Sequence, residues 1–466
     1  MAHSTRLALR AQLQSLRRHF LQGAGLPFSD VLPAQRVLDA LAAAAVTFRD
    51  RLFTPVVTLW AFLSQVVSKD HSCLTAVARL NAYRVAHRRP PCSARTGSYC
   101  KARQRLPEAA LARLARDTGR DLQRQSPAAW RWRGRPVKIA DGSSVSMPDT
   151  PANQRAFPQP GGQKAGLGFP VARIVTILSL ACGAVLDLAL GPCRGKQTGE
   201  TALLRELHGA LEPGDILLTD RYFCSYWELA LLGQRGVDAV MRLHQRRRVD
   251  FRRGRRLGPD DHAVAWEKPG RPGWMDEATY QALPDSLVVR ETRLWVHRPG
   301  FRTRVLLVAT TLLNPAAAPR RELGALYRQR WCAELDLRSI KQAMPMDVLR
   351  CQTPEMVRKE VWAHLLVYNL IRAAMAAAAV QAGVCPRELS FEGARQTLEA
   401  FRETLARATV TELPGVVQAV LEAIASHRVG DRPDRYEPRV RKRRPKQYPL
   451  MKEPRQQARE RMAKAS

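Results

Sequence analysis

The stretch Tyr327-Arg-Gln-Arg-Trp-Cys-Ala-Glu334-Leu-Asp-Leu-Arg-Ser-Ile-Lys341 places polar residues at intervals of three, four and seven. In an α-helix, which turns about 100° per residue, such intervals return to one face. The side chains expected within an arc of roughly 60° are those of Tyr327, Arg330, Glu334 and Lys341. A single acid among cations on a helix is most often a solvated ion-pair face. This face therefore indicates a functional site only if further acidic residues join it.

Two aspartates upstream stand at the ends of apolar runs. Asp141 ends the run Val-Lys-Ile-Ala, and Asp220 ends the run Ile-Leu-Leu-Thr. Each run has the pattern of a short buried strand, which would deliver the carboxylate to its C-terminal edge. For either aspartate alone the alternative is a turn cap, because Asp is common in turns. Two such acids together with Glu334 form a set that caps and surface ion pairs do not require.

The charge of this set suggests its chemistry. Three carboxylates close together repel one another and take up protons, unless divalent metal ions hold them. Oxygen ligands of this kind suit Mg²⁺ or Mn²⁺, and two ions about 3.5–4 Å apart activate a water and stabilise the leaving oxygen of a phosphodiester. We therefore interpret Asp141, Asp220 and Glu334 as catalytic, metal-binding residues. Arg330 and Lys341 would hold phosphates of the strand that is cut.

These residues resemble the DDE transposases of bacterial insertion sequences, of the insertion sequence 4 type. The spacing Tyr-x2-Arg-x3-Glu-x6-Lys, from Tyr327 to Lys341, matches the signature of that family at every position, and Asp141-Gly-Ser and Thr-Asp220-Arg-Tyr are also similar to it. The resemblance covers approximately residues 50–375 and the basic tail. It implies an RNase H-like catalytic fold, metal-dependent cleavage at terminal inverted repeats and 3′-OH strand transfer. It also implies a homodimer assembled on double-stranded DNA.

Further DNA contacts are expected around the three acids. Tyr327 belongs to the signature, and Arg221 follows Asp220 directly. Lys164, in the Pro- and Gly-rich loop 148–168, is a candidate contact to flanking DNA. An N-terminal helical module would add phosphate contacts or read the terminal repeat, although a layer that supports the catalytic domain is an equal alternative. Its basic residues are Arg79, Arg84, Arg88, Arg89, Arg95, Lys101, Arg103 and Arg105.

A tryptophan in the insertion before the catalytic helix is a candidate for stacking on a flipped base. In transposases of this kind an aromatic side chain there can hold a base during hairpin formation. The candidates are Trp266, Trp274 and Trp295, and Trp295 is favoured because it lies in an expected hairpin strand. Packing is the more frequent role of a tryptophan in a hairpin.

Composition sets limits on partner and compartment. Lys plus Arg number 75 against 42 Asp plus Glu among 466 residues, a net charge of +33 that favours a polyanionic partner such as DNA. A coding bias toward Arg and Ala explains part of this excess. The nine cysteines include no C-x2-C pair, which suits reduced thiols in a cytoplasm. The resemblance implies that this cytoplasm is bacterial and that the protein lies at the nucleoid. The basic segment 1–22 lacks the apolar centre of an export signal, and no membrane span is expected.

The expected fold class is α/β, an RNase H-like catalytic core with a β-rich insertion before the last catalytic helix. Its strands are expected at residues 137–141, 171–180, 184–190, just before Asp220, and at 237–241, with a hairpin at 286–296 and 303–312. The expected regions are 1–125, a helical N-terminal domain; 126–242, the first part of the core; 243–318, the insertion; 319–430, the catalytic helix and C-terminal helices; and 431–466, a basic, disordered tail.

The sequence thus predicts a DNA transposase that cleaves terminal inverted repeats and transfers the 3′-OH to target DNA, by cut-and-paste and with hairpin ends as one route. Mg²⁺ is the expected cofactor and Mn²⁺ a substitute. Two alternatives remain at this point. One is an inactive or domesticated transposase that only binds DNA, and the other is a nuclease of RNase H fold without strand transfer.

Overall fold

The computed structural model describes residues 32, 34–45, 51–68, 70–86, 88–295, 305–409, 411–430 and 450–465. The basic segment 1–22, the turn of the expected hairpin and the basic run 439–446 lie outside the described residues.

Five strands form one half of a nine-stranded mixed sheet. They are β1 (Val137–Ser146), β2 (Val171–Ser179), β3 (Val185–Pro192), β4 (Ile216–Thr219) and β5 (Asp238–Arg242). Their order is β3-β2-β1-β4-β5, in which β1 pairs antiparallel with β2 and parallel with β4. The five expected strands are confirmed, but the loop expected at 148–168 contains the short helix α7 (Pro151–Ala156), which lies between β1 and β2. Since successive residues alternate faces, Ile139 packs into the core on one side of the sheet and Ala140 into the core on the other.

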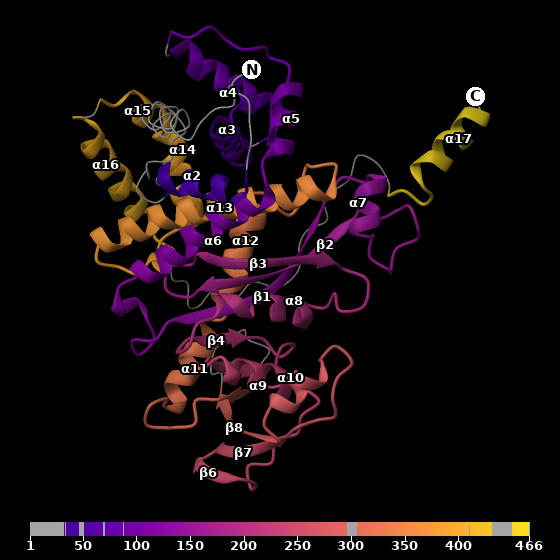
Figure 1. Ribbon diagram of the computed structural model, residues 1–466. Helices are drawn as coiled ribbons and strands as arrows, with labels where there is room; N and C mark the ends of the chain where they lie inside the picture. Colours follow the sequence, from indigo (N-terminus) through magenta and orange to yellow (C-terminus); the bar gives the residue numbers. More distant parts are fainter. Residues whose placement is uncertain are drawn as a thin grey trace.

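The insertion continues the same sheet. It contains β6 (Arg255–Gly258), β7 (Asp261–Glu267), α10 (Glu277–Ala282), β8 (Ser286–Trp295) and β9 (Val305–Thr310). β9 pairs antiparallel with both β5 and β8, which confirms the predicted hairpin and gives the order β5-β9-β8-β7-β6. The insertion extends the sheet because the edge of β5 would otherwise present unpaired N–H and C=O groups. It forms the lower part of the molecule in Figure 1.

Helices cover both faces of the sheet (Figure 1). On one face lie α6 (Glu108–Gln125) and the 28-residue α13 (Pro354–Gln381), and on the other lie α8 (Glu200–Glu206) and α9 (Tyr226–Gln234). Asn369 of α13 donates to the carbonyls of Ala115 (2.9 Å) and Val185 (2.8 Å), which ties α13 to both α6 and β3. By length and composition α13 could span a membrane, but 89% of its apolar window is buried inside the protein, as expected of a core helix.

The remaining helices pack around α13 or project from the body. The N-terminal part contains α2 (Ala34–Ala43), α3 (Pro55–Val67), α4 (Cys73–Ala86) and α5 (Gly97–Arg105), and Leu106-Pro107 separates α5 from α6. α7 (Pro151–Ala156) follows β1. After α13 the chain forms α14 (Phe391–Ala400), α15 (Arg402–Arg407) and α16 (Leu413–Ser426), in the region where C-terminal helices were predicted.

Two predictions about basic segments need correction. The tail was expected to be disordered, but Arg455–Ala465 forms helix α17, which is rich in Ala, Arg, Gln, Glu, Met and Lys, residues of high helix propensity. Arg103 was expected to meet DNA, but it is 9% exposed and donates to Gln65 Oε1 (2.9 Å). Its guanidinium also lies over the rings of Phe62 and Tyr99, because a buried arginine needs partners for its charge.

The sequence predicted one continuous helix for the signature segment, but this helix is interrupted. α11 (Arg320–Arg328) ends before Arg330, α12 (Trp331–Arg338) carries Glu334, and Ser339–Ala343 forms a π-helix that contains Lys341. At the junction the N–H of Arg330 donates to the carbonyl of Tyr327, a tight i→i−3 turn (3.1 Å). Short 3₁₀ turns and π segments inside helices often mark functional positions.

The contact between α6 and β3 leaves no room for a side chain at Gly119. A Cβ atom there would lie 2.1 Å from the carbonyl oxygen of Val185 and 2.9 Å from Nδ2 of Asn369. Gly119→Ala should therefore lower the free energy of unfolding by about 1–3 kcal/mol, as overpacked cores do, measured by denaturant titration. Gly233→Ala, at a helical glycine with nothing within 4 Å, is the control and should be neutral or stabilising. Equal stability of the two variants would contradict this packing.

Candidate active site

The three acids predicted from the sequence line one cavity. Asp141 lies within β1, Asp220 follows the last residue of β4, and Glu334 lies in the first turn of α12. The cavity has a volume of about 560 Å³. Its other lining residues are Gly142, Ser143, Arg330, Leu337, Arg338, Lys341, Gln342 and Asp347. Residues nearly 200 positions apart in the sequence therefore meet at one edge of the sheet.

The sequence predicted that Asp141 ends its strand, but the strand continues beyond it. β1 continues to Ser146 because its residues from Gly142 onward keep pairing with β2. The pairing with β4 stops at Ile139, two residues before Asp141. Asp141 therefore lies where β1 extends beyond its parallel neighbour, and Asp220 leaves the end of that neighbour.

Arg330 links two of the acids. Its Nη1 donates to Oδ2 of Asp141 (3.2 Å), and its Nη2 donates to Oε1 of Glu334 (2.8 Å). The side chain of Arg330 is 18% exposed, so both ion pairs are partly shielded from water. Lys341 donates to the hydroxyl of Ser143 (3.2 Å) from the π-helix. The signature cations therefore lie among the acids, as the sequence predicted.

Burial raises the pKa of Asp141 to about 6, against the charge of Arg330 and the N–H of Gly142, which donates to Oδ1 (2.9 Å). The negative charges of Asp220 and Glu334 raise this pKa further. Asp220 accepts a hydrogen bond from the N–H of Tyr222 (2.8 Å), which holds its carboxylate in a local turn. The carboxylate of Asp141 is therefore poorly solvated and gains from any additional positive charge.

The donor set fits a divalent cation in its chemistry, with one rearrangement. Among the residues that the structure describes, no three Asp, Glu, His or Cys side chains come close enough together to share a metal ion. The guanidinium of Arg330 lies between Asp141 and Glu334 and forms an ion pair with each. Three carboxylates that face one cavity are nevertheless the hard oxygen donors that Mg²⁺ and Mn²⁺ prefer. A metal ion would take over the neutralising role that Arg330 has here.

Tyr327 and Arg221 lie outside the cavity lining. Tyr327 is 5% exposed, and burial raises its pKa to about 12. Arg221 donates to the side chain of Gln245 (2.9 Å). Arg242, at the end of β5, was not among the residues predicted from the sequence. Burial lowers its pKa, the charge of Arg221 lowers this pKa further, and Tyr327 acts in the opposite direction. The sequence of β5 could have indicated Arg242, because it is the one cation of that strand.

The tryptophan candidates differ in accessibility. Trp266 is 2% exposed, donates to Glu291 Oε1 (2.8 Å) and lies under Arg247, so it is a packing residue and not a base-stacking one. Trp274 lies under the guanidinium of Arg205, 3.7 Å from it. Trp295 is 50% exposed at the end of β8. These observations leave Trp295 as the accessible candidate of the three.

Two further residues complete the comparison with the sequence. Trp331, which the sequence analysis did not single out, is 53% exposed and follows Arg330 directly on the catalytic helix. Its position inside the signature could have indicated it. Lys164 is exposed in the loop before β2, away from the cavity lining.

Asp336 lies outside the cavity lining, on the side of α12 opposite to Glu334. It is fully buried and forms ion pairs with Arg372 and Arg387. Arg387 also donates to the carbonyls of Ser179 and Leu180 (both 2.8 Å). The face of α12 opposite to Glu334 is thereby attached to the end of β2.

The sequence of the chain is similar to those of known transposases. The model of the transposase DDE domain matches residues 132–370, a range that contains all three acids and the complete signature. Transposase InsG for insertion sequence element IS4, of Escherichia coli strain K12, is 27% identical over 432 residues, which cover 90% of this chain and 92% of that protein. Putative transposase InsZ of the same organism is 25% identical over 213 residues, 45% of this chain and 68% of that protein.

Among solved structures, the piggyBac transposase synaptic complex with hairpin DNA gives a TM-score of 0.41 at 12% identity and covers 90% of this chain and 88% of that chain. No conclusion rests on a similarity of that size. The match to the family model includes every residue of the cavity discussed above. The chain therefore belongs to the DDE transposase family and is an enzyme of the insertion sequence 4 type.

Proposed function

We propose that this insertion-sequence transposase moves its element by cut-and-paste. It would cleave the phosphodiester at the terminal inverted repeats and then direct the freed 3′-OH to target DNA. The family acts on DNA and depends on divalent metal ions. The observation that supports the proposal in this chain is the single cavity that contains Asp141, Asp220 and Glu334 together with Arg330 and Lys341. The α/β core would be RNase H-like. The N-terminal helical region would span residues 1–125, the insertion residues 243–318 and the tail residues 431–466.

We propose that Asp141, Asp220 and Glu334 hold Mg²⁺, with Mn²⁺ as a substitute. The ions would supply activation of the attacking hydroxyl and stabilisation of the leaving oxygen. Once Asp141 and Glu334 are neutralised in this way, the guanidinium of Arg330 is available to pair with a phosphate in bidentate geometry.

Further cations would extend the contact to DNA. Lys341 and Arg338 line the cavity, and Arg242 and Arg221 interact beside it. Tyr327, buried next to these arginines, would support them and not contact DNA itself. At the tip of the insertion Arg252 and Arg253 have side chains that are 91% and 82% exposed.

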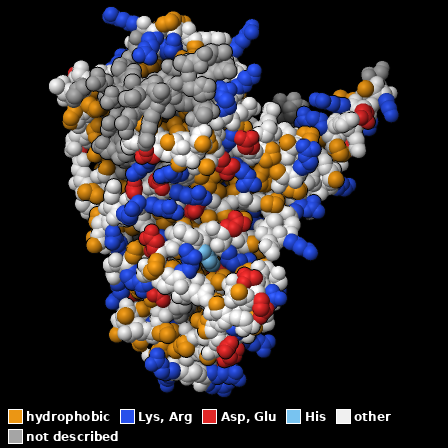
Figure 2. Space-filling model, viewed as in Figure 1, with side chains coloured by type: hydrophobic (Ala, Val, Ile, Leu, Met, Phe, Trp, Pro, Cys, Tyr) orange, Lys and Arg blue, Asp and Glu red, His pale blue; other side chains and the backbone are white. Residues whose placement is uncertain are grey.

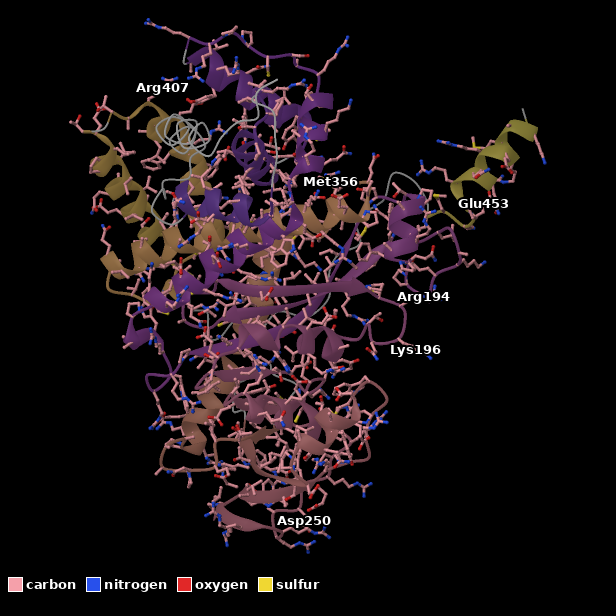
Figure 3. All side chains as sticks on the ribbon, viewed as in Figure 1. Arg194, Lys196, Asp250, Met356, Arg407 and Glu453 are labelled. Carbon is pink, nitrogen blue, oxygen red and sulfur yellow. The ribbon has the colours of Figure 1, made fainter. Side chains whose placement is uncertain are left out.

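Figure 2 shows Lys and Arg side chains gathered at the lower end of the molecule, where the insertion lies, and Figure 3 labels Asp250 beside that end. Such a surface suits a phosphate backbone. Lys164 would contact flanking DNA. The assembly on DNA would be a homodimer in the bacterial cytoplasm, at the nucleoid.

If the ends pass through a hairpin, a displaced base needs an aromatic surface. Trp331 and Trp295 are the two half-exposed tryptophans among the described residues that belong to the catalytic helix or to the insertion hairpin. We assign the stacking role to Trp331, because it is adjacent to Arg330 and therefore close to the acids.

Two alternatives lead to different products. An inactive, DNA-binding descendant of a transposase would not nick element ends in the presence of metal. A hydrolytic nuclease of the same fold would release cleaved ends but would not join them to a plasmid. Incubation with element ends, Mg²⁺ and a plasmid target, with products mapped at nucleotide resolution, separates all three.

Alanine at any of the three acids should abolish cleavage. Asp141→Ala, Asp220→Ala and Glu334→Ala each remove a negative charge from the proposed metal site, and we expect a loss of at least about a hundredfold in cleavage rate. DNA binding, measured by gel shift, should stay close to the parental level. Asp149→Ala is the control, because this exposed aspartate does not line the cavity. Cleavage near the parental rate in any of the three variants would show that the assignment is wrong.

Lys341→Ala should weaken binding to all DNA sequences alike. Removal of one phosphate contact should reduce the slope of log affinity against log salt concentration by about 1, measured by fluorescence anisotropy between low and physiological salt. Arg235→Ala is the control, because Arg235 is exposed at the opposite end of the strands, just before β5. An unchanged slope in Lys341→Ala would exclude a phosphate contact at this lysine.

Trp331→Ala should slow the step that follows the first nick. Stacking on a base contributes about 1–3 kcal/mol, so we expect roughly a tenfold loss of hairpin product and a brighter signal from 2-aminopurine placed at the element end. Trp331→Phe should restore most of both. If Trp295→Ala shows this loss and Trp331→Ala does not, the base stacks on the insertion instead.

A further inference from the structure

Glu200 lies against the strand that carries Asp141. A Cβ atom placed on Gly142 would lie 2.5 Å from Cδ, 2.7 Å from Oε1 and 2.9 Å from Oε2 of Glu200. The carboxylate is therefore packed flat against the Cα of Gly142, the residue that follows Asp141. Glu200 is the first residue of α8 and belongs to neither the cavity lining nor the signature.

The carboxylates of Glu200 and Asp141 approach β1 from opposite sides. Side chains alternate along a strand, and Ala140 packs into the core on the side of α8 while Ile139 packs on the side of α12. Asp141 therefore points toward α12, where it meets Arg330. Gly142 faces α8, and its lack of a side chain leaves the space that the carboxylate of Glu200 fills.

The charges around Glu200 connect it to the acids. Burial raises the pKa of Glu200, the charge of Arg173 lowers it, and the charge of Asp220 raises it again, so Asp220 is close enough to interact. Arg173 of β2 pairs with Ser144 of β1, and both lie on the same face of the sheet as Gly142. Its Nη1 donates to the carbonyl of Thr198 (2.7 Å), in the loop that leads to α8. Figure 3 labels Arg194 and Lys196, two exposed cations of this loop.

The edge of the sheet is open between the two acids. β4 stops at Thr219, and its pairing with β1 reaches only Ile139. No strand therefore separates the carboxylate of Glu200 from Asp220 beyond that point. A negative charge on the α8 side of β1 can therefore act on the cavity on the α12 side across the thickness of one strand.

We propose that Glu200 is a further acidic residue of the active site, outside the cavity lining: a positioning residue whose charge, packed against Gly142 on the far side of β1, strengthens the hold of Asp141 and Asp220 on a divalent cation. This inference rests on the proposed metal role of Asp141 and Asp220. A simple ion pair between Glu200 and Arg173 that only stabilises the fold is the alternative.

Binding of Mn²⁺ to the full-length protein without DNA tests the inference, with free Mn²⁺ followed by electron paramagnetic resonance. Glu200→Gln should weaken Mn²⁺ binding about tenfold, the lower end of what residues that support metal sites contribute, with an unchanged melting temperature. Glu206→Gln is the control, because Glu206 is exposed on the same helix. Unaltered affinity in Glu200→Gln would overturn the inference.

Two further variants separate charge from folding. Arg173→Gln removes a positive charge that opposes Glu200, so it should strengthen Mn²⁺ binding, whereas a structural ion pair predicts that Arg173→Gln and Glu200→Gln weaken it alike. Gly142→Ala should displace the carboxylate of Glu200 and weaken binding. The double variant Gly142→Ala with Glu200→Gln should then be no weaker than Gly142→Ala alone. Additive losses would overturn the proposed link between the two residues.

The proposed function can fail independently of this inference. Asp141→Ala should remove most Mn²⁺ binding if the metal role holds. Loss of binding in Asp141→Ala with no change in Glu200→Gln rejects only the role of Glu200. No change in either variant rejects the metal site itself.

Discussion

The active site depends on the compensation of negative charge. Asp141, Asp220 and Glu334 face one cavity, and without a cation their mutual repulsion would oppose the fold that brings them together. In the structure Arg330 supplies that cation through ion pairs to Asp141 and Glu334. The same requirement explains why an arginine of the signature lies four residues before the acidic residue.

The catalytic helix is held in place from behind. Asp336, two residues after Glu334, is fully buried between Arg372 and Arg387, and Arg387 reaches the carbonyls at the end of β2. Loss of one partner from such a buried ion pair is strongly destabilising, because the other charge stays buried. The anchor therefore sets the rotation of α12 and directs Glu334 toward β1. The tight turn before α12 and the π-helix after it then place Arg330 and Lys341 at the same cavity.

The early end of strand β4 helps to form the cavity. β4 stops short, β1 extends beyond it, and the space between them is where Asp141 and Asp220 meet. β1 thereby presents different chemistry on its two faces, Asp141 toward α12 and Gly142 toward Glu200. The insertion continues the sheet from the edge of β5. The exposed Arg252 and Arg253 at its tip are therefore attached to the same sheet as the acids.

The sequence alone determined the five expected strands, the three acids and the signature cations, because apolar periodicity and fixed spacing are local properties of the chain. It also determined that Asp336 faces away from Glu334, since helical rotation alone separates them. Tertiary structure decided where strand pairing stops and that the signature helix is interrupted. It also decided that Trp266 and Arg103 are buried while Trp331 is exposed. The positions of Arg242 and Glu200 were decided in the same way. These features depend on contacts between segments far apart in the chain, whose packing and charge pairing no local pattern records.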